Sequence, residues 1–309
     1  MQKIKDLLIE NIKMIPEDRF TKEQLKESLE SFESWFESKK IQSENQEFFE
    51  KEYSIYSLTL DALIIWNISI TLIMLEESPE LKSEADSEYT QKGYFTQLLI
   101  LLTNNLFSVK YLYELGFDTQ AKTVYRNSIE ISDLALCILY RKDFFENHIK
   151  PNHKKEGNPF ISPKNKTIEG MSESVMREIG KSLGRKQNSK EAFDIYWNAI
   201  RKDHYTKLSE SAHGNFYHNV INSLKKISHN KFVPSISGGK WIEMEQSLSE
   251  ICLHQIAMKR YFTWALDIKH DINLFDNSTY SHKMIWYLDV IIGAKFLRIL
   301  IEPMIENAK

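Results

Sequence analysis

Five polar residues with a repeated spacing of four are the groups in this sequence best suited to chemistry. Arg126 and Glu130 are four apart, which places them on one face of a helix. Tyr205, Ser209 and His213 repeat this spacing and form one stripe of a second helix. His213 could act as a general acid or base near neutral pH, with Arg126 holding an anionic group. We therefore predict a candidate catalytic site made of these five residues.

The same residues also have a structural interpretation. Both stripes lie on otherwise apolar helical faces. Burying a charged group on such a face costs free energy unless the group forms an ion pair or has a functional role. If the stripes face each other, Arg126 can bond Glu130 while Tyr205 or His213 completes a network. Such a network could fix the register of the packed helices without any chemistry. A binding pocket without chemistry is a third interpretation, and the sequence leaves all three open.

The elements that must position these residues are helices, and the predicted fold class is all-α. Nearly every periodic stretch in the 309 residues has helical spacing, and glycine and proline are scarce. We expect a multi-helix bundle of about eight to ten helices. Its central apolar helices are predicted near residues 60–75, 95–115 and 284–301.

The first stripe belongs to a predicted helical hairpin. Residues 91–115 and 118–142 form its two helices, and Gly116 suits the left-handed position that ends the first one. Asp118 or Thr119 suits the cap of the second helix. The connection is short, so the two helices should pack antiparallel.

Other helices are expected on either side of this hairpin. One long helix is predicted from about residue 44 to residue 75, before the hairpin. The helix that starts near Tyr205 is expected to continue to about residue 227. The second stripe would lie within this later helix.

Composition divides the chain at about residue 90. Residues 1–90 form a predicted acidic N-terminal helical extension that includes the long helix. Residues 91–309 form the predicted main helical bundle, which is interrupted by a basic loop near residues 149–170. Loops of this length inside compact domains are often functional.

Targeting, membrane and cofactor signals are weak in this sequence. The chain starts without the apolar core of a signal peptide, and the apolar run at 60–75 is short of the ~20 residues that a membrane span needs. Cys137 and Cys252 fit no metal or redox spacing. We therefore expect a cytoplasmic protein with no membrane span, no metal and no cofactor.

Charge is distributed unevenly along the chain. The net charge is −3, yet residues 150–240 carry roughly +9 by count of charged side chains. This asymmetry can mark a surface for nucleic acid, with RNA favoured over DNA, or for a protein partner. The alternative is that the basic residues simply fill a solvated loop and nearby helix faces. Plentiful apolar surface also allows a homodimer. The residues predicted to bind the partner are Lys154, Lys155, Lys164, Lys166, Arg185, Lys186 and Lys207.

A set of positions within about residues 90–215 matches a family pattern. These positions are Gly116, Ala121, Arg126, Glu130, Tyr205, Leu208, Ser209 and His213. They resemble a bacterial family of helical proteins of unknown function, in which an Arg-x-x-x-Glu helix precedes Leu-Ser and then a histidine. The resemblance implies an all-helical fold. Its members tend to occur among bacterial accessory and mobile-element genes, which hints at antiviral (phage) defence.

A second resemblance concerns Arg141 and His148, which are separated by six residues. This spacing is similar to that of HEPN ribonucleases, which are helical bundles, commonly dimeric, that cut RNA without a metal. The segment from Lys207 to His213 has a similar length but has lysine in place of arginine. Arg126 could supply the missing guanidinium from another helix.

These observations favour a helical accessory or regulatory protein that binds a protein or nucleic-acid partner through its basic middle region. The alternative is a HEPN-like, metal-independent ribonuclease that uses His213 or His148 with an arginine.

Overall fold

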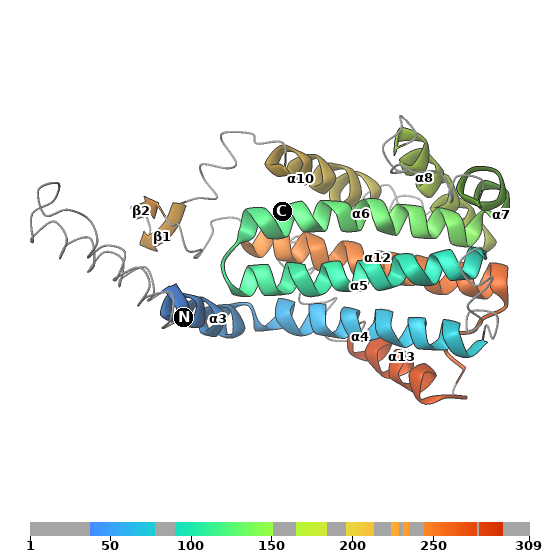
Figure 1. The fold of residues 1–309 in the computed structure, drawn as a ribbon, viewed down its shortest axis with the longest axis horizontal. Helices are drawn as coiled ribbons and strands as arrows, with labels where there is room; N and C mark the ends of the chain where they lie inside the picture. The colour runs from blue at the N-terminus through green and yellow to red at the C-terminus, as the bar shows by residue number, and fades with distance from the viewer. Residues whose placement is uncertain are drawn as a thin grey trace, which may run out of the picture.

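A computed structural model shows an all-α bundle built around four long helices. It describes residues 38–77, 90–150, 165–183, 196–212, 224–228, 231–234, 244–276 and 278–292. The long helices are α4 (Ser54–Glu77), α5 (Gln91–Glu114), α6 (Asp118–Tyr140) and α12 (Met244–His270). Figure 1 shows α4, α5 and α6 side by side in one layer, with α12 packed behind them. The predicted fold class is therefore confirmed.

Shorter elements cover the outer faces of this body. They are α3 (Ser38–Glu52), α7 (Lys142–Phe144), η3 (Phe145–Ile149), α8 (Asn165–Ser182), η5 (Tyr196–Asp203), α10 (His204–Ala212) and α13 (Tyr280–Ile291). Helices α8 and α10 pack on α6, and α13 packs on α4 (Figure 1). A small antiparallel hairpin, β1 (Leu224–Ser228) with β2 (Lys231–Pro234), lies away from the bundle.

The turn between α5 and α6 follows the predicted glycine but not the predicted cap. Gly116 has a φ of 80°, the left-handed conformation that glycine adopts without a steric penalty. The amide of Phe117 donates to Leu112 O over 2.7 Å, which closes the end of α5. Phe117, rather than Asp118 or Thr119, occupies the cap position of α6. Asp118 instead pairs in a buried contact with Lys122 at 2.7 Å.

Side chains from other helices satisfy the last backbone carbonyls of α6. The final turn of a helix leaves its C=O groups without partners inside the helix. Gln91 at the start of α5 donates from Nε2 to Ile138 O and to Leu139 O, at 2.5 and 3.1 Å. His270 at the end of α12 lies 2.8 Å from the same Leu139 O. Hydrogen bonds thus connect α5, α6 and α12 at one end of the bundle.

Helix α4 is the strongly apolar helix predicted near residues 60–75. Trp66, Ile70 and Ile73 are fully buried. Of the described helices, α4 is long and apolar enough to cross a membrane, but 61% of its apolar window is buried inside the bundle. The long helix of the predicted N-terminal extension thus packs against α5, α12 and α13. The division at residue 90 remains a prediction.

Three predicted helix boundaries differ from the structure. The single helix predicted over 44–75 is broken at Tyr53, where α3 gives way to α4 within an aromatic cluster of Phe49, Tyr53 and Tyr56. The helix expected to reach residue 227 is wrong over its last part, because residues 224–228 form β1. The apolar helix predicted at 284–301 is present as α13, which starts earlier, at Tyr280, and residues beyond 292 lie outside the described chain. Its predicted central position is wrong, because α13 packs on the outer side of α4 while α6 and α12 complete the centre.

We predict that Leu102→Ala lowers the free energy of unfolding by about 2–5 kcal/mol, because this substitution leaves a cavity between α5 and its neighbours. Leu102 is 1% exposed, whereas Leu183 at the end of α8 is 38% exposed. The matched variant Leu183→Ala should change stability by less than about 1 kcal/mol. Urea denaturation followed by circular dichroism measures both, and equal losses would contradict the packing described.

Candidate functional site

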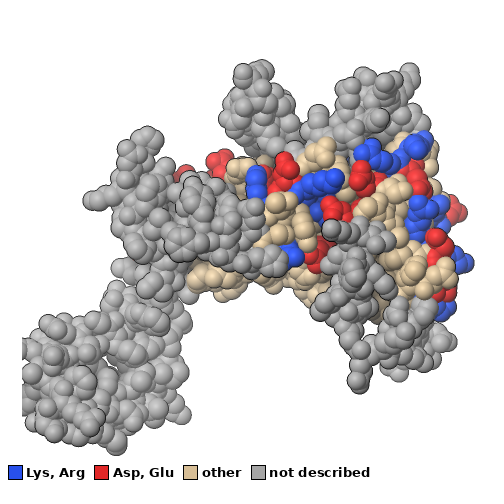
Figure 2. Space-filling model, turned by 90° about the horizontal axis from the view of Figure 1, so that it is seen from above, with Lys and Arg blue, Asp and Glu red and all other residues tan. Residues whose placement is uncertain are grey.

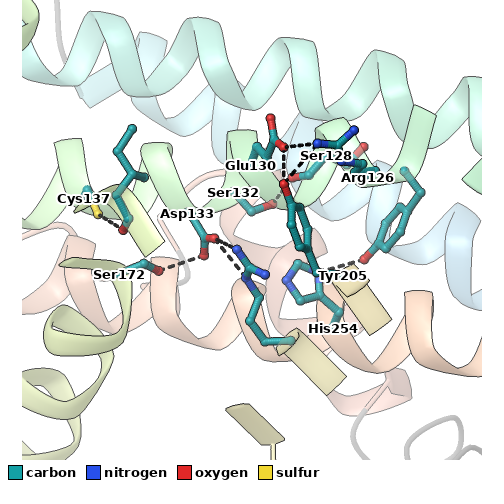
Figure 3. Close-up of polar contacts among 12 residues, drawn as sticks. Arg126, Ser128, Glu130, Ser132, Asp133, Cys137, Ser172, Tyr205 and His254 are labelled. Carbon is teal, nitrogen blue, oxygen red and sulfur yellow. Dashed lines mark hydrogen bonds and ion pairs between the residues drawn. The ribbon is translucent and has the colours of Figure 1, made fainter. Parts of the chain in front are cut away.

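Helices α6 and α10 bring three of the predicted site residues together. On α6, Ile129 is fully buried, so Arg126 and Glu130 lie at the edge of the helix–helix contact. On α10, the buried Leu208 anchors the helix, and Tyr205 lies about one turn earlier. Since α10 packs on α6, the ring of Tyr205 points at the other two side chains (Figure 3).

Tyr205 connects the other two residues through its hydroxyl. The hydroxyl donates to Glu130 Oε1 over 2.5 Å and accepts from Arg126 Nη2 over 3.4 Å. Arg126 Nη2 lies 3.5 Å from the same carboxylate oxygen. Burial and the bond to Glu130 raise the pKa of Tyr205, so the phenol keeps its proton. We call Arg126, Glu130 and Tyr205 the triad.

The triad is only partly buried. The side chains of Arg126 and Glu130 are 26% and 36% exposed. A guanidinium has five N–H donors, and the described contacts of Arg126 use Nη2 alone. Its Nε is buried and has no hydrogen-bond partner among the described residues. Arg126 therefore retains donors for a further acceptor.

The other two predicted catalytic residues are not joined to the triad by a described contact. The hydroxyl of Ser209 is buried without a hydrogen-bond partner in the described part of the chain. His213 lies outside the described residues. The two predicted stripes therefore do face each other, as shown by three of the five residues. The catalytic role of all five stays a prediction.

A fully buried ion pair lies next to the triad. Asp133 Oδ2 on α6 accepts from Arg201 Nε of η5 at 2.9 Å and from its Nη2, and both side chains are at most 3% exposed. Ser172 of α8 donates to the other carboxylate oxygen over 2.8 Å. Arg201 also stacks on the Tyr205 ring, with Cζ 4.8 Å from its centroid. The pair joins three elements and supports the triad.

This buried pair is not predicted from the sequence. The available signal was a charged residue, Asp133, placed directly before the apolar run 134–140, since a charge there needs a partner. The partner itself could not be named, because Arg201 is 68 residues away in the sequence.

A second buried network connects α6 with α12. The hydroxyl of Tyr125 lies 2.7 Å from His254 Nδ1 and accepts from Gln255 Nε2 at 3.1 Å. Burial lowers the pKa of His254 well below its ordinary value, so this ring is neutral. The network includes no predicted site residue.

His204, at the start of α10, is a second neutral buried histidine. Its ring stacks on Tyr125, with centroids 5.7 Å apart. Burial, with Lys207, Lys122 and Arg201 nearby, lowers the pKa of His204 to about 3. Its Nε2 lies 3.5 Å from Glu250 Oε2 of α12. The neutral ring allows the start of α10 to sit in the core.

The alternative pair, Arg141 and His148, is oriented toward other groups. Arg141 donates from Nη2 to Glu178 Oε1 of α8. His148 is an exposed residue of η3, and its ring lies 5.7 Å from the ring of Phe144. The described contacts therefore give this pair separate neighbours rather than a shared site.

The predicted partner-binding residues are described only in part. Lys154, Lys155, Lys164, Arg185 and Lys186 lie outside the described ranges, as does the side chain of Lys166 in α8. The side chain of Lys207 is 49% exposed, and it pairs with Glu250 at 3.2 Å. Figure 2 shows basic and acidic side chains interspersed on the described surface above α6.

The residues described by the structure include no cluster of metal ligands. No group of three His, Cys, Asp or Glu residues among them could hold a metal ion. Cys137 and Cys252 are buried free thiols, and burial raises the pKa of both.

Comparison with known proteins places the chain in no group. No protein-family model, no curated protein and no solved structure matches it. The two family resemblances of the sequence therefore stay expectations.

We predict that stability falls with acid because of His204. The unfolded state binds a proton with a pKa near 6.5, whereas the folded state binds it with a pKa of about 3. The contribution of His204 to the free energy of unfolding is therefore fully present above pH 6.5 and is lost as the pH falls toward 3. Between pH 7.5 and 5 the loss is about 2 kcal/mol. His204→Phe should remove that part of the pH dependence in urea titrations, whereas the exposed-site control His148→Gln should behave like the parent.

We predict that substitutions of the two arginines that contact Tyr205 lower the stability by very different amounts. Arg201→Leu leaves Asp133 as an unpaired buried charge and should lower the free energy of unfolding by about 3–5 kcal/mol. Arg126→Leu removes a partly exposed pair and should cost less than about 1 kcal/mol. Thermal and urea unfolding of both variants checks this, and a large loss in Arg126→Leu would make the triad structural.

Proposed function

We propose that this protein is a helical accessory protein that binds RNA through the triad and the neighbouring basic middle region. The triad would hold a phosphate, and the excess positive charge of residues 150–240 would attract the polyanion. A cytoplasmic location and a role in bacterial phage defence are parts of the same proposal. The location derives from the composition of the sequence, and the defence role derives from the family resemblance.

The observation that carries the proposal is the unused hydrogen-bonding capacity of Arg126. Its contacts with described residues use Nη2, so Nη1 has no described partner, and the side chain is 26% exposed. Arg201 nearby uses both Nε and Nη2 on Asp133. A planar guanidinium with free donors at a partly exposed site matches the geometry of a phosphate.

The surroundings of Arg126 support a nucleotide at this position. Its Cζ lies 5.5 Å from the centroid of the Tyr205 ring, which Arg201 contacts as well, at 4.8 Å. A partly exposed cation beside an aromatic ring is a combination found where proteins contact unpaired bases. It favours a single-stranded partner over a duplex, whose bases are already stacked.

The metal-independent ribonuclease remains the second candidate function. It is favoured by the hydrogen bond from Tyr205 to Glu130, because a carboxylate oriented by such a bond at a partly exposed site can act as a general base. His213, one turn after Ser209 in the sequence, would be the other acid or base. An assay with labelled RNA distinguishes binding from cleavage and so separates the two functions.

We predict that the parent protein retards labelled single-stranded RNA in a gel containing EDTA, and that Arg126→Gln weakens this binding at least about tenfold. The expected loss follows from removing charge-assisted hydrogen bonds to a phosphate. Arg177→Gln is the matched control, because Arg177 forms the same four-apart ion pair, with Glu173, at 36% exposure. The control should bind like the parent.

Other outcomes would change the assignment. RNA that is cleaved by the parent and left intact by a folded His213→Ala variant would establish the ribonuclease. If Arg126→Gln and Arg177→Gln weakened RNA binding equally, the binding would depend on the overall positive charge and not on the triad. Intact and unretarded RNA would reject both RNA functions.

A further inference from the structure

Helices α4 and α5 expose a continuous row of large apolar side chains. Leu58, Ile65 and Leu72 of α4 are between 42% and 55% exposed, and Ile100, Phe107 and Tyr111 of α5 between 45% and 59%. Single exposed apolar residues are ordinary on protein surfaces, but contiguous rows of this kind mark interaction sites. We call these six residues the α4–α5 face.

An ion pair fixes how the two rows align. Lys110 Nζ of α5 lies 2.6 Å from Asp61 of α4. Since α4 and α5 run antiparallel in Figure 1, this contact places Phe107 beside Ile65 and Ile100 beside Leu72. The face is therefore one ridge of paired apolar side chains rather than two separate rows.

The spacing along each helix suits packing against other helices. Residues 58, 65 and 72 are seven apart, and residues 100, 107 and 111 are separated by seven and four. A repeat of seven keeps one seam facing a partner helix that crosses at about 20°. The α4–α5 face thus has the spacing expected for one of the two helix pairs in a four-helix bundle.

We propose that the α4–α5 face binds the same face of a second copy of this chain, so that the protein is a two-fold symmetric dimer. A two-fold contact requires a patch that complements itself. The charges beside the face are already paired, because Lys110 contacts Asp61 at 2.6 Å and Glu114 at 3.5 Å, so two copies can meet without bringing unpaired charges together. Apolar rows on both sides then exclude water from the contact.

The area of the face is that of a small interface. Residues 58–72 and 100–111 extend over about 21 and 17 Å of their helices, and two adjacent helices present a width of about 18 Å. The resulting area is roughly 300–400 Å² per copy, about half of the roughly 800 Å² of a standard interface, so the dimer is expected to be weak and to depend on protein concentration. A membrane is a poorer occupant, because most of the apolar window of α4 is already buried inside the bundle.

The test is the mass of the full-length protein in solution, measured by size-exclusion chromatography with light scattering. The parent should be a dimer at about 1–100 µM. The double variant Ile65→Glu, Phe107→Glu should be monomeric, with a dissociation constant raised at least about 100-fold and an unchanged circular dichroism spectrum. The matched control Leu183→Glu, Tyr280→Glu adds the same charge at exposed sites on α8 and α13 and should stay dimeric.

Several results would overturn the proposal. A monomeric parent, a dimer that survives Ile65→Glu, Phe107→Glu, or a control that dissociates equally would each do so. A monomeric parent that melts at a lower temperature after the double substitution would instead assign the face to another segment of its own chain. Flotation of the parent with phosphatidylcholine–phosphatidylglycerol vesicles would assign it to a membrane.

Discussion

The buried ion pair between Asp133 and Arg201 is the interaction on which the site depends. Two charges removed from water are tolerated only when they pair closely and their remaining oxygens are bonded, as Ser172 provides here. The pair fastens η5 and α8 to α6, and Arg201 also contacts the ring of Tyr205. Because α10 follows η5 directly, this contact positions the start of α10, and the buried Leu208 then holds the helix and the triad against α6.

The charged side chains of α6 are buried to different extents. Asp133 lies in the core with a full set of partners, whereas Arg126, two turns earlier, lies at the edge with donors to spare. Between these extremes, His204 and His254 stay neutral because burial opposes their charged forms. The same few turns of the bundle thus contain a structural pair, a neutral layer and a candidate binding group.

Local spacing explains what could be predicted from the sequence. Arg126 and Glu130 follow from the four-residue helical repeat, and Gly116 follows from the need for a left-handed turn. The partnership of Asp133 with Arg201 had no such signal, because a 68-residue separation is resolved only by tertiary packing. The break at Tyr53 was missed for the same reason, since a cluster of aromatic rings packs at that point.

The two cysteines have a practical consequence. They are the only cysteines in the chain, they lie in α6 and α12, and both thiols are buried and protonated. A thiol reagent can reach them only when a core helix opens, so their rate of modification reports that opening directly. The two central helices therefore contain natural probes, and a single cysteine introduced at the surface could be labelled selectively in the native protein.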